Sequence, residues 1–324
     1  MPLSAAVASR VILDTDMAMG VPGSDIDDGF ALALALAEPS MTVECVTTVN
    51  GNADVESGSF LSVELLDRLG SPEIPVIQGA AAPLQYPDGR RRAPEGIREQ
   101  FGHRAPHPGY AALELVRRAA AEPGEITVVA IGPLTNVAAA INIDPDFARN
   151  VKEIVVMGGV FLEHTNRSGM PGEFNFWVDP EAADAVMRSG AAIRLVGLDV
   201  TLTVQLTREH AMAMQKSDSD FGRFAGEYTL GWIDHLRENN PGDPNAGRSC
   251  AMHDPLAVAA LAHPELLTWK DAHVGIVTGP SIARGVAVAD FLTGDVNPES
   301  NVRIAVDVDA DAFLDYFFER LSSI

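Results

Sequence analysis

Short apolar runs rich in valine and isoleucine recur along the chain, and they alternate with longer segments whose apolar residues follow a helical period. The short runs predict strands at residues 10–14, 42–49, 75–78, 126–131, 154–157 and 192–196. The longer segments predict helices at residues 27–37, 54–69, 110–121, 135–141, 180–189, 221–239 and 255–261. This alternation is typical of an α/β fold, a mostly parallel open sheet with a Rossmann-like core flanked by helices.

The last part of the chain follows a different pattern. Residues 267–308 are predicted to form short strands joined by turns, and a final helix is predicted at residues 309–321. The sequence has no internal repeat, no low-complexity linker and no clear domain boundary. We therefore expect a single domain over residues 1–324, with a small strand-rich appendage near the C-terminus.

The composition narrows the class of protein. A formal net charge of −22 with no basic face argues against binding to a nucleic-acid backbone. The apolar stretches are interrupted by charges well short of a membrane span, and two cysteines cannot form a disulfide framework. We expect a cytoplasmic enzyme that acts on a small molecule, with no nucleic-acid or membrane partner.

Carboxylates gather after the first predicted strand. Asp14 and Asp16 end that strand, and Asp25, Asp27 and Asp28 precede or open the next helix. Five carboxylates within fifteen residues repel one another unless a cation lies among them, so a hard divalent metal is the simplest explanation. The alternative is that the last three only cap the helix and interact with its dipole.

Polar or glycine residues also follow the other predicted strands. They form the segments Thr48-Val49-Asn50-Gly51-Asn52, Gly132-Pro133-Leu134-Thr135-Asn136 and Met157-Gly158-Gly159. Glu173-Phe174-Asn175 and His253-Asp254-Pro255 come later in the chain. Because ligands of open parallel sheets bind at the carboxyl ends of the strands, these segments are the candidates for a shared site.

Seven blocks together resemble the inosine-uridine nucleoside hydrolase family in order and spacing. They are LDTD, DIDDGFALALAL, TTVNGN, GPLTN, VVMGG, EFNFWVDPEAA and HDPLAV, and they span residues 11 to about 262. The resemblance implies an α/β enzyme that hydrolyses the N-glycosidic bond of ribonucleosides by attack of a metal-bound water. It also implies a homo-oligomer, either a dimer or a tetramer.

The resemblance assigns roles to particular residues. It implies a Ca²⁺ held by Asp16, Asp28, Asp254 and the backbone carbonyl of Thr135. Asp27 would act as the general base, and His253 would protonate the leaving base, unless His253 is a packed or metal-orienting histidine. The ribose would bind to Asn52, Asn166, Glu173 and Asn175, with further substrate contacts from Asp27 and Asp254.

The chain departs from the family pattern in its first loop. Met17 to Asp25 intervene between the two acidic groups, which leaves Asp25 as a competitor for a ligand role. Asn166 is only the nearest candidate for a contact to the 5′-hydroxyl. Tyr228, Trp232 and His235 could contact the base, but their helical spacing equally fits packing residues.

Two other functions fit parts of the sequence. A haloacid-dehalogenase-like phosphatase also has an acidic strand end, but it would need a downstream helical lysine and a strand-end serine or threonine, which the sequence does not supply. A non-catalytic nucleoside or ribose binder would retain the fold and the metal. The sequence does not fix the preferred base.

Overall fold

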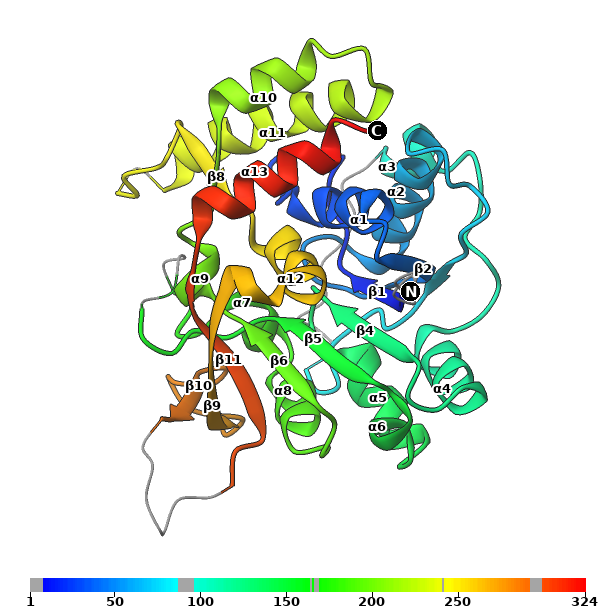
Figure 1. Cartoon of the computed structure of the whole chain (residues 1–324), viewed down its shortest axis with the longest axis vertical. Helices are drawn as coiled ribbons and strands as arrows, with labels where there is room; N and C mark the ends of the chain where they lie inside the picture. Colours follow the sequence, from blue (N-terminus) through cyan, green and yellow to red (C-terminus); the bar gives the residue numbers. More distant parts are fainter. Residues whose placement is uncertain (1–7, 87–95, 164, 166–168, 241, 292–298) are drawn as a thin grey trace, which may run out of the picture.

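A computed structural model describes residues 8–86, 96–163, 165, 169–240, 242–291 and 299–324. Its main feature is a nine-stranded sheet in the order β10-β9-β11-β6-β5-β4-β1-β2-β3 (Figure 1). The parallel strands are β1 (Ser9–Thr15), β2 (Met41–Thr48), β3 (Val76–Gln78), β4 (Ile126–Ala130), β5 (Glu153–Met157), β6 (Ile193–Val196) and β11 (Val302–Val308). β9 (Leu267–Ile276) and β10 (Ala287–Asp290) are antiparallel to their neighbours. The predicted α/β class is confirmed.

Apolar side chains cover both faces of this sheet. In β1, Val11 and Leu13 belong to one hydrophobic core, and Ile12 belongs to the other. Successive residues of a strand point to opposite faces, so a strand buried on both sides has a continuous apolar run. This is why the short runs of valine and isoleucine located the central strands correctly.

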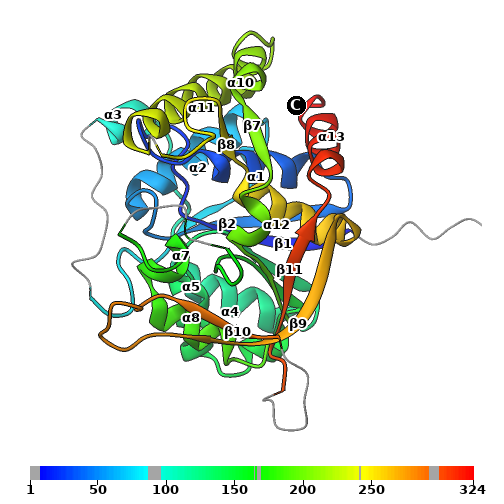
Figure 2. The same ribbon diagram turned by 90° about the vertical axis from the view of Figure 1, so that its left-hand side faces the viewer.

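Helices form one layer on each side of the sheet, and Figure 2 shows the two layers on opposite sides. The first layer contains α1 (Asp27–Ala37), α2 (Val55–Arg68), α12 (His253–Ala262) and α13 (Ala310–Leu321). The second contains α4 (Ala111–Ala121), α5 (Thr135–Ile143), α6 (Phe147–Asn150) and α8 (Pro180–Met187). The seven predicted helices and the C-terminal helix all occur, with ends that differ by a few residues.

Beyond the first layer lie α10 (Arg208–Gln215) and α11 (Asp220–Asn239), together with a two-stranded sheet of β7 (Gln205–Thr207) and β8 (Ser249–Ala251). The remaining elements are short: α3 (Ile97–Phe101), α7 (Phe174–Val178), α9 (Leu198–Thr201) and a 3-10 turn at Pro264–Leu266. The sequence pattern did not predict the short elements or α10, because segments of this length show little periodicity. No helix in the described parts of the chain is long and apolar enough to cross a membrane.

The C-terminal segment is strand-rich, as expected, but its strands extend the main sheet. β11 pairs in parallel with β6, and β9 pairs with β11 in the opposite direction. Val302 and Ile304 enter one core while Ala305 enters the other, which fixes β11 as an interior strand. Because β11 is buried on both faces, the C-terminal segment forms part of the main sheet.

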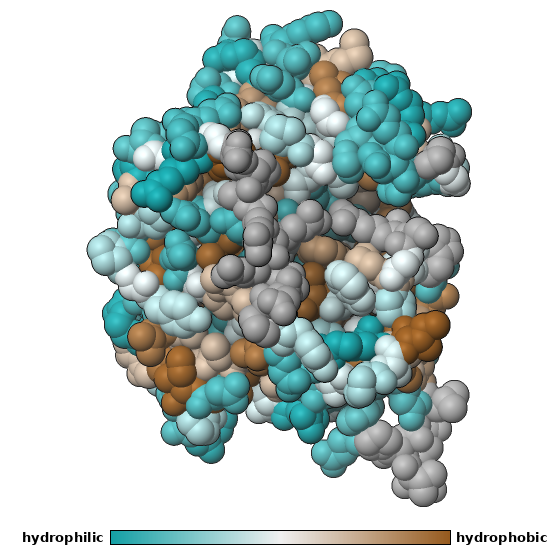
Figure 3. Space-filling model, turned by 180° about the vertical axis from the view of Figure 1, so that it is seen from behind, coloured by the Kyte–Doolittle hydropathy of each residue, from teal (hydrophilic) through white to brown (hydrophobic). Residues whose placement is uncertain are grey.

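The surface seen from behind is mostly hydrophilic where the residues are described, with hydrophobic side chains in small separate groups (Figure 3). This distribution is ordinary for a globular protein. The important feature lies at one edge of the sheet. β1 and β4 are neighbours, yet the chain proceeds to β2 on one side and to β5 on the other. Such a switch in direction leaves a crevice at the carboxyl ends of the strands, where open α/β sheets bind their ligands.

Candidate active site

Asp14 ties neighbouring strands together at the carboxyl end of β1. Its Oδ1 accepts hydrogen bonds from Thr47 Oγ1 (2.6 Å) and Asn136 Nδ2 (2.8 Å). The side chain is fully buried, and burial raises its pKa to about 6 in spite of these two donors. Asp14 therefore joins β1 to β2 and to the start of α5, beside the crevice.

Asp16 lies in a cradle formed by glycine backbone. Its Oδ2 accepts a hydrogen bond from the Asn52 backbone N–H (2.6 Å). A Cβ atom at Gly51 would lie 2.0 Å from Oδ2 of Asp16, and one at Gly132 would lie 2.9 Å from Oδ1. Only glycine at these positions lets the loops after β2 and β4 approach the carboxylate this closely.

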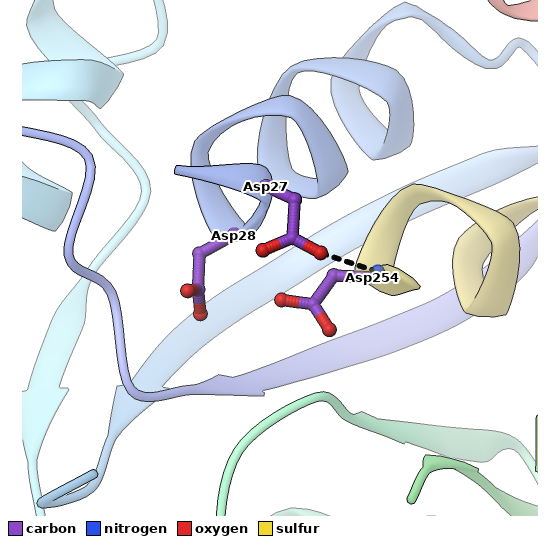
Figure 4. Close-up of side chains that lie close together, drawn as sticks. All are labelled: Asp27, Asp28 and Asp254. Atoms are coloured by element: carbon purple, nitrogen blue, oxygen red, sulfur yellow. Dashed lines mark hydrogen bonds between the residues drawn. The ribbon is translucent and has the colours of Figure 1, made fainter. Parts of the chain in front are cut away.

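Three further carboxylates meet beside the crevice. Asp27 and Asp28 open α1, and Asp254 lies in the first turn of α12. One oxygen from each lies within 4.8 Å of the others, and Asp27 Oδ2 accepts the Asp254 backbone N–H (3.0 Å), as Figure 4 shows. Thr15 donates a hydrogen bond from its hydroxyl to Asp28. Two helix N-termini thus direct their acidic residues at one point.

The electrostatics of this group call for a cation. Burial raises the pKa values of Asp16 and Asp27 to about 7, and it raises those of Asp28 and Asp254 well above the ordinary range, with neighbouring carboxylates adding to each shift. Asp16 Oδ1 and Asp28 Oδ2 are buried and have no hydrogen-bond partner within the described structure. Closely spaced carboxylate oxygens without donors are the ligands that hard divalent cations prefer, so the residues present fit a calcium-type ion.

Glu173 and Asn175 lie at the ends of β4 and β5. Glu173 caps α7 and accepts backbone N–H groups from Asn175 (2.7 Å), Phe176 (3.0 Å) and Gly159 (3.1 Å). Asn175 Nδ2 donates to the carbonyl oxygens of Ile131 (3.0 Å) and Met157 (3.2 Å). Both side chains are therefore held rigidly by the strand ends that they join.

Two cavities adjoin these residues. The inner cavity, about 40 Å³, is lined by Asp25, Asp27, Asn52, Ile131, Met157, Glu173, Phe174, Asn175, Leu198, His253 and Asp254. The outer cavity, about 710 Å³, shares Asp25, Leu198 and His253 with it and has an apolar wall of Leu202, Trp232 and Leu236. A polar pocket thus lies beside a larger one with an apolar wall, an arrangement suited to a ligand with one hydrophilic and one flat apolar part.

His253 lies between the two cavities at the start of α12. Its Nδ1 is 2.7 Å from Thr201 Oγ1, and the ring is only 8% exposed. Asp25 also lines both cavities. The longer first loop therefore places an additional carboxylate at the junction.

The structure brings most of the predicted residues together. Eight of them lie in or directly against the inner cavity: Asp16, Asp27, Asp28, Asn52, Glu173, Asn175, His253 and Asp254. Thr135, predicted to bind the ion through its backbone carbonyl, is not among the residues that line the inner cavity, and its hydroxyl donates to Asp179 Oδ2 (2.6 Å). Ile131, just after β4, lines that cavity. Asn166 lies outside the described residues.

The aromatic candidates on α11 differ in position. Trp232 lines the outer cavity and stacks on His235, with ring centroids 5.3 Å apart. Tyr228 packs against Phe224, with ring centroids 4.7 Å apart. Trp232 is thus the aromatic residue placed to contact a ligand, and Tyr228 packs inside the helix layer.

Sequence reasoning missed α9, which follows β6. Leu198 lines both cavities, and the Asp199 carboxylate accepts backbone N–H groups from Phe161, Leu162 and Glu163. Thr201 contacts His253. The segment Gly197-Leu198-Asp199-Val200-Thr201 follows a predicted strand, so the strand-end argument applied to the other loops would have found it.

Comparisons with known proteins identify similar sequences and structures. The family model for inosine-uridine preferring nucleoside hydrolase matches residues 11–315. Probable uridine nucleosidase 1 of Oryza sativa is 34% identical and covers 84% of this chain and of its own. Pyrimidine-specific ribonucleoside hydrolase RihA of Citrobacter koseri is 32% identical, covering 98% of this chain and 99% of its own.

Two solved structures are also similar. A plant nucleoside hydrolase, PpNRh1, superposes with a TM-score of 0.84 at 28% identity, and the match covers 98% of this chain and 99% of that one. The purine-preferring ribonucleoside hydrolase from Gardnerella vaginalis gives a TM-score of 0.84 at 28% identity, with 97% and 98% coverage.

Proposed function

Because this chain belongs to the inosine-uridine preferring nucleoside hydrolase family, and is therefore an N-glycosyl hydrolase of ribonucleosides, we propose that its reaction depends on Ca²⁺ held at the inner cavity. The observation that carries the proposal is the convergence of Asp27, Asp28 and Asp254, with unpartnered buried oxygens on Asp16 and Asp28. Membership of this family decides against the haloacid-dehalogenase-like phosphatase.

The proposed ligands of the ion are Asp16, Asp28, Asp254 and a backbone carbonyl of the loop after β4. The position of Ile131 in the inner cavity, and the approach of Gly132 to Asp16, support the Ile131 carbonyl in place of that of Thr135. When bound, the cation would polarise the ribose hydroxyls and the attacking water, and would lower the pKa of that water.

Asp27 is proposed as the general base. Its carboxylate lines the inner cavity, and the Asp254 backbone N–H fixes the direction of one of its oxygens. Proton transfer requires a positioned base whose pKa lies near the working pH. A carboxylate whose surroundings oppose its charge, as burial and Asp28 do here, is a better proton acceptor than an exposed one.

We propose that the inner cavity binds the ribose through Asn52, Glu173 and Asn175. Asn166 is the candidate for a contact to the 5′-hydroxyl. Asp27 and Asp254 also line this cavity and would contact the sugar. An amide can donate to and accept from hydroxyl groups, and a carboxylate accepts from them, in fixed directions. The leaving base would lie in the outer cavity, against Trp232 and beside His253, which we propose donates the proton that the base needs.

Uridine is the first substrate to test, because the relatives at 32–34% identity are named for uridine and pyrimidine ribonucleosides. Ribose release should be observed with purified protein, should be lost after removal of divalent metal, and should return with added Ca²⁺.

Asp28→Asn should abolish the response to Ca²⁺, whereas Asp315→Asn, an exposed change on α13, should not. Full turnover by verified metal-free protein would contradict calcium dependence, and binding of ribonucleosides without any ribose release would indicate a binder.

We also propose that the protein acts in the cytoplasm as a homo-oligomer, either a dimer or a tetramer. Both cysteines are free and buried, which suits a reducing compartment. Light scattering of the purified protein would give the oligomeric state, and a monomer at micromolar concentration would contradict the proposal.

A further inference from the structure

The four-residue helix α9 is a rigid platform beside the site. The Leu198 N–H donates to the Gly159 carbonyl (2.9 Å), and a Cβ atom at Gly197 would lie 2.8 Å from that same oxygen. The Asp199 carboxylate accepts three consecutive backbone N–H groups from residues 161–163, as described above. α9 is thereby attached to the loop that follows β5, so its side chains have little freedom to move.

Thr201 at the end of α9 contacts His253, which comes 52 residues later in the chain. The Thr201 backbone N–H is bonded to the Gly197 carbonyl (3.1 Å), and its hydroxyl lies 2.7 Å from Nδ1 of the imidazole. Thr201 is fully buried, and His253 lines both cavities. The Nδ1 edge of the ring is therefore held inside the protein by Thr201, and the same residue lines both cavities.

We infer that Thr201 is a positioning residue, whose hydroxyl oxygen accepts the Nδ1–H of His253 and so commits Nε2 to deliver the proton to the departing base. The inference rests on the proposed role of His253. A histidine is oriented by the hydrogen bond that its other ring nitrogen makes, and Thr201 supplies that bond here.

The cleavage step conserves bonds and protons. The C1′–N bond breaks with its electron pair passing to the base, and a proton moves from Nε2 of the imidazolium to that base. The oxygen of water bonds to C1′, and the proton that it loses passes to Asp27. His253 then remains as the neutral tautomer with its proton on Nδ1, still bonded to Thr201.

Activity of three variants on two substrates tests the inference. Thr201→Val preserves the shape of the side chain and removes the hydroxyl. It should lower kcat/KM for uridine by about 10- to 10²-fold, less than loss of the acid itself. It should change kcat/KM for p-nitrophenyl riboside by less than about 3-fold, since that phenolate departs without a proton.

Thr201→Ser should restore uridine hydrolysis. Thr229→Val, which removes a buried hydroxyl bonded only to its own helix, is the matched control.

The double variant Thr201→Val/His253→Ala separates positioning from general damage. It should be no less active on uridine than His253→Ala alone, because Thr201 acts through the ring. Equal losses on both substrates, or a further loss in the double variant, would overturn the inference. If His253→Ala itself shows no dependence on the leaving group, the proposed acid fails, and that outcome is distinct from failure of Thr201 alone.

Nitrogen-15 NMR of the wild-type protein gives a check that needs no Thr201 variant. The neutral ring of His253, assigned by comparison with His253→Ala, should carry its proton on Nδ1. A neutral ring protonated on Nε2 would mean that Thr201 donates to the imidazole, and the inference would then be wrong.

Discussion

Asp27 and His253 are each the first residue of a helix, and they line the same inner cavity from α1 and α12. We expect Asp27→Ala to lower kcat by about 10²- to 10⁴-fold on uridine and on p-nitrophenyl riboside alike, because both reactions need an activated water. Steady-state kinetics on the two substrates measures this. A variant that kept normal activity on the activated substrate would show that the base lies elsewhere, with Asp25 as the next carboxylate to test.

His253 should behave differently, because its proposed role is to protonate the leaving group and not to activate the water. His253→Ala should lose about 10²-fold or more on uridine while p-nitrophenyl riboside is hydrolysed nearly normally. The same assays measure both values, and His107→Ala, on an exposed loop, is the control. Equal losses of kcat on the two substrates would mean that His253 orients Asp254 or supports the fold, and that the acid must be sought near Trp232.

The proposed sugar contacts predict strong selection for the 2′-hydroxyl. A site whose buried polar groups bind a hydroxyl rejects the analogue that lacks it by on the order of 10⁴-fold, because those groups are left unpaired. We expect 2′-deoxyuridine to show a kcat/KM far below that of uridine in a direct comparison. Equal efficiency for the two would contradict the proposed placement of the ribose in the inner cavity.

At the scale of residues, the sequence predicted which side chains meet but not all of their neighbours. The acidic residues, Asn52 and the Glu173 segment are located by strand ends, and strand ends are visible as apolar runs. The strand-end argument covers the segment that contains Thr201, but the contact of Thr201 with His253 appears only when α9 and α12 are packed together. The choice between Ile131 and Thr135 likewise depends on where the chain turns after β4.

At the scale of elements, the connection after α1 is held to α13 by one buried carboxylate. Glu38 is only 4% exposed and accepts hydrogen bonds from the Ser40 N–H and hydroxyl, from Tyr316 and from Arg320. These donors outweigh the opposing effect of burial and lower its pKa to about 2. Among the described residues, His263 also faces it, with Nε2 4.0 Å from Glu38 Oε2.

Glu38→Gln should reduce the free energy of unfolding by about 1–3 kcal/mol at pH 7, because it leaves buried donors poorly satisfied. The lowered pKa means that the unfolded chain binds the proton first as pH falls. The stabilisation is therefore complete above about pH 4.5 and is lost between there and pH 2. Urea unfolding at several pH values measures the difference, with Glu319→Gln as the exposed control. A difference that stayed constant down to pH 2 would contradict this account.

Periodicity predicted long elements well and short ones poorly. The runs at 10–14 and 126–131 are buried on both faces, so their composition alone reveals them. α7 and α9 have five and four residues, respectively, and are fixed by caps and tertiary contacts, which leave no period in the sequence. The C-terminal strands were recognised as strands, but their joining of the main sheet follows from the two-sided burial of β11, which pattern alone does not reveal.

At the scale of the whole molecule, the fold concentrates negative charge where it is most costly. Asp16, Asp27, Asp28 and Asp254 are all buried, in a chain whose formal net charge is −22 with these four residues included. Two rigid cores hold these carboxylates together, so the folded protein cannot relieve the repulsion by separating them. Protons or a cation must do so, and the two compete for the same oxygens.

The last prediction concerns how Ca²⁺ changes stability as a function of pH. In metal-free protein the pKa values of Asp16 and Asp27 are raised to about 7, so between pH 4 and 7 the folded state binds more protons than the unfolded state. Stability of the metal-free protein should therefore rise as pH falls from 8 toward 5. Saturating Ca²⁺ should remove most of this dependence, and at 100 times its Kd it should add about 2.7 kcal/mol.

Thermal unfolding with and without chelator, at pH 5 and pH 8, measures both effects. The gain from Ca²⁺ should be larger at pH 8, where fewer protons compete for the site. Asp28→Asn removes one negative charge from the cluster, so it should lose most of the gain from Ca²⁺ while the metal-free variant is at least as stable as the metal-free parent at pH 8. Asp315→Asn should retain the full gain.

An Asp28→Asn variant that kept the full gain would place the ion elsewhere. A metal-free protein whose stability fell between pH 8 and pH 5 would show that the raised pKa values, and with them the electrostatic case for the cation, are wrong.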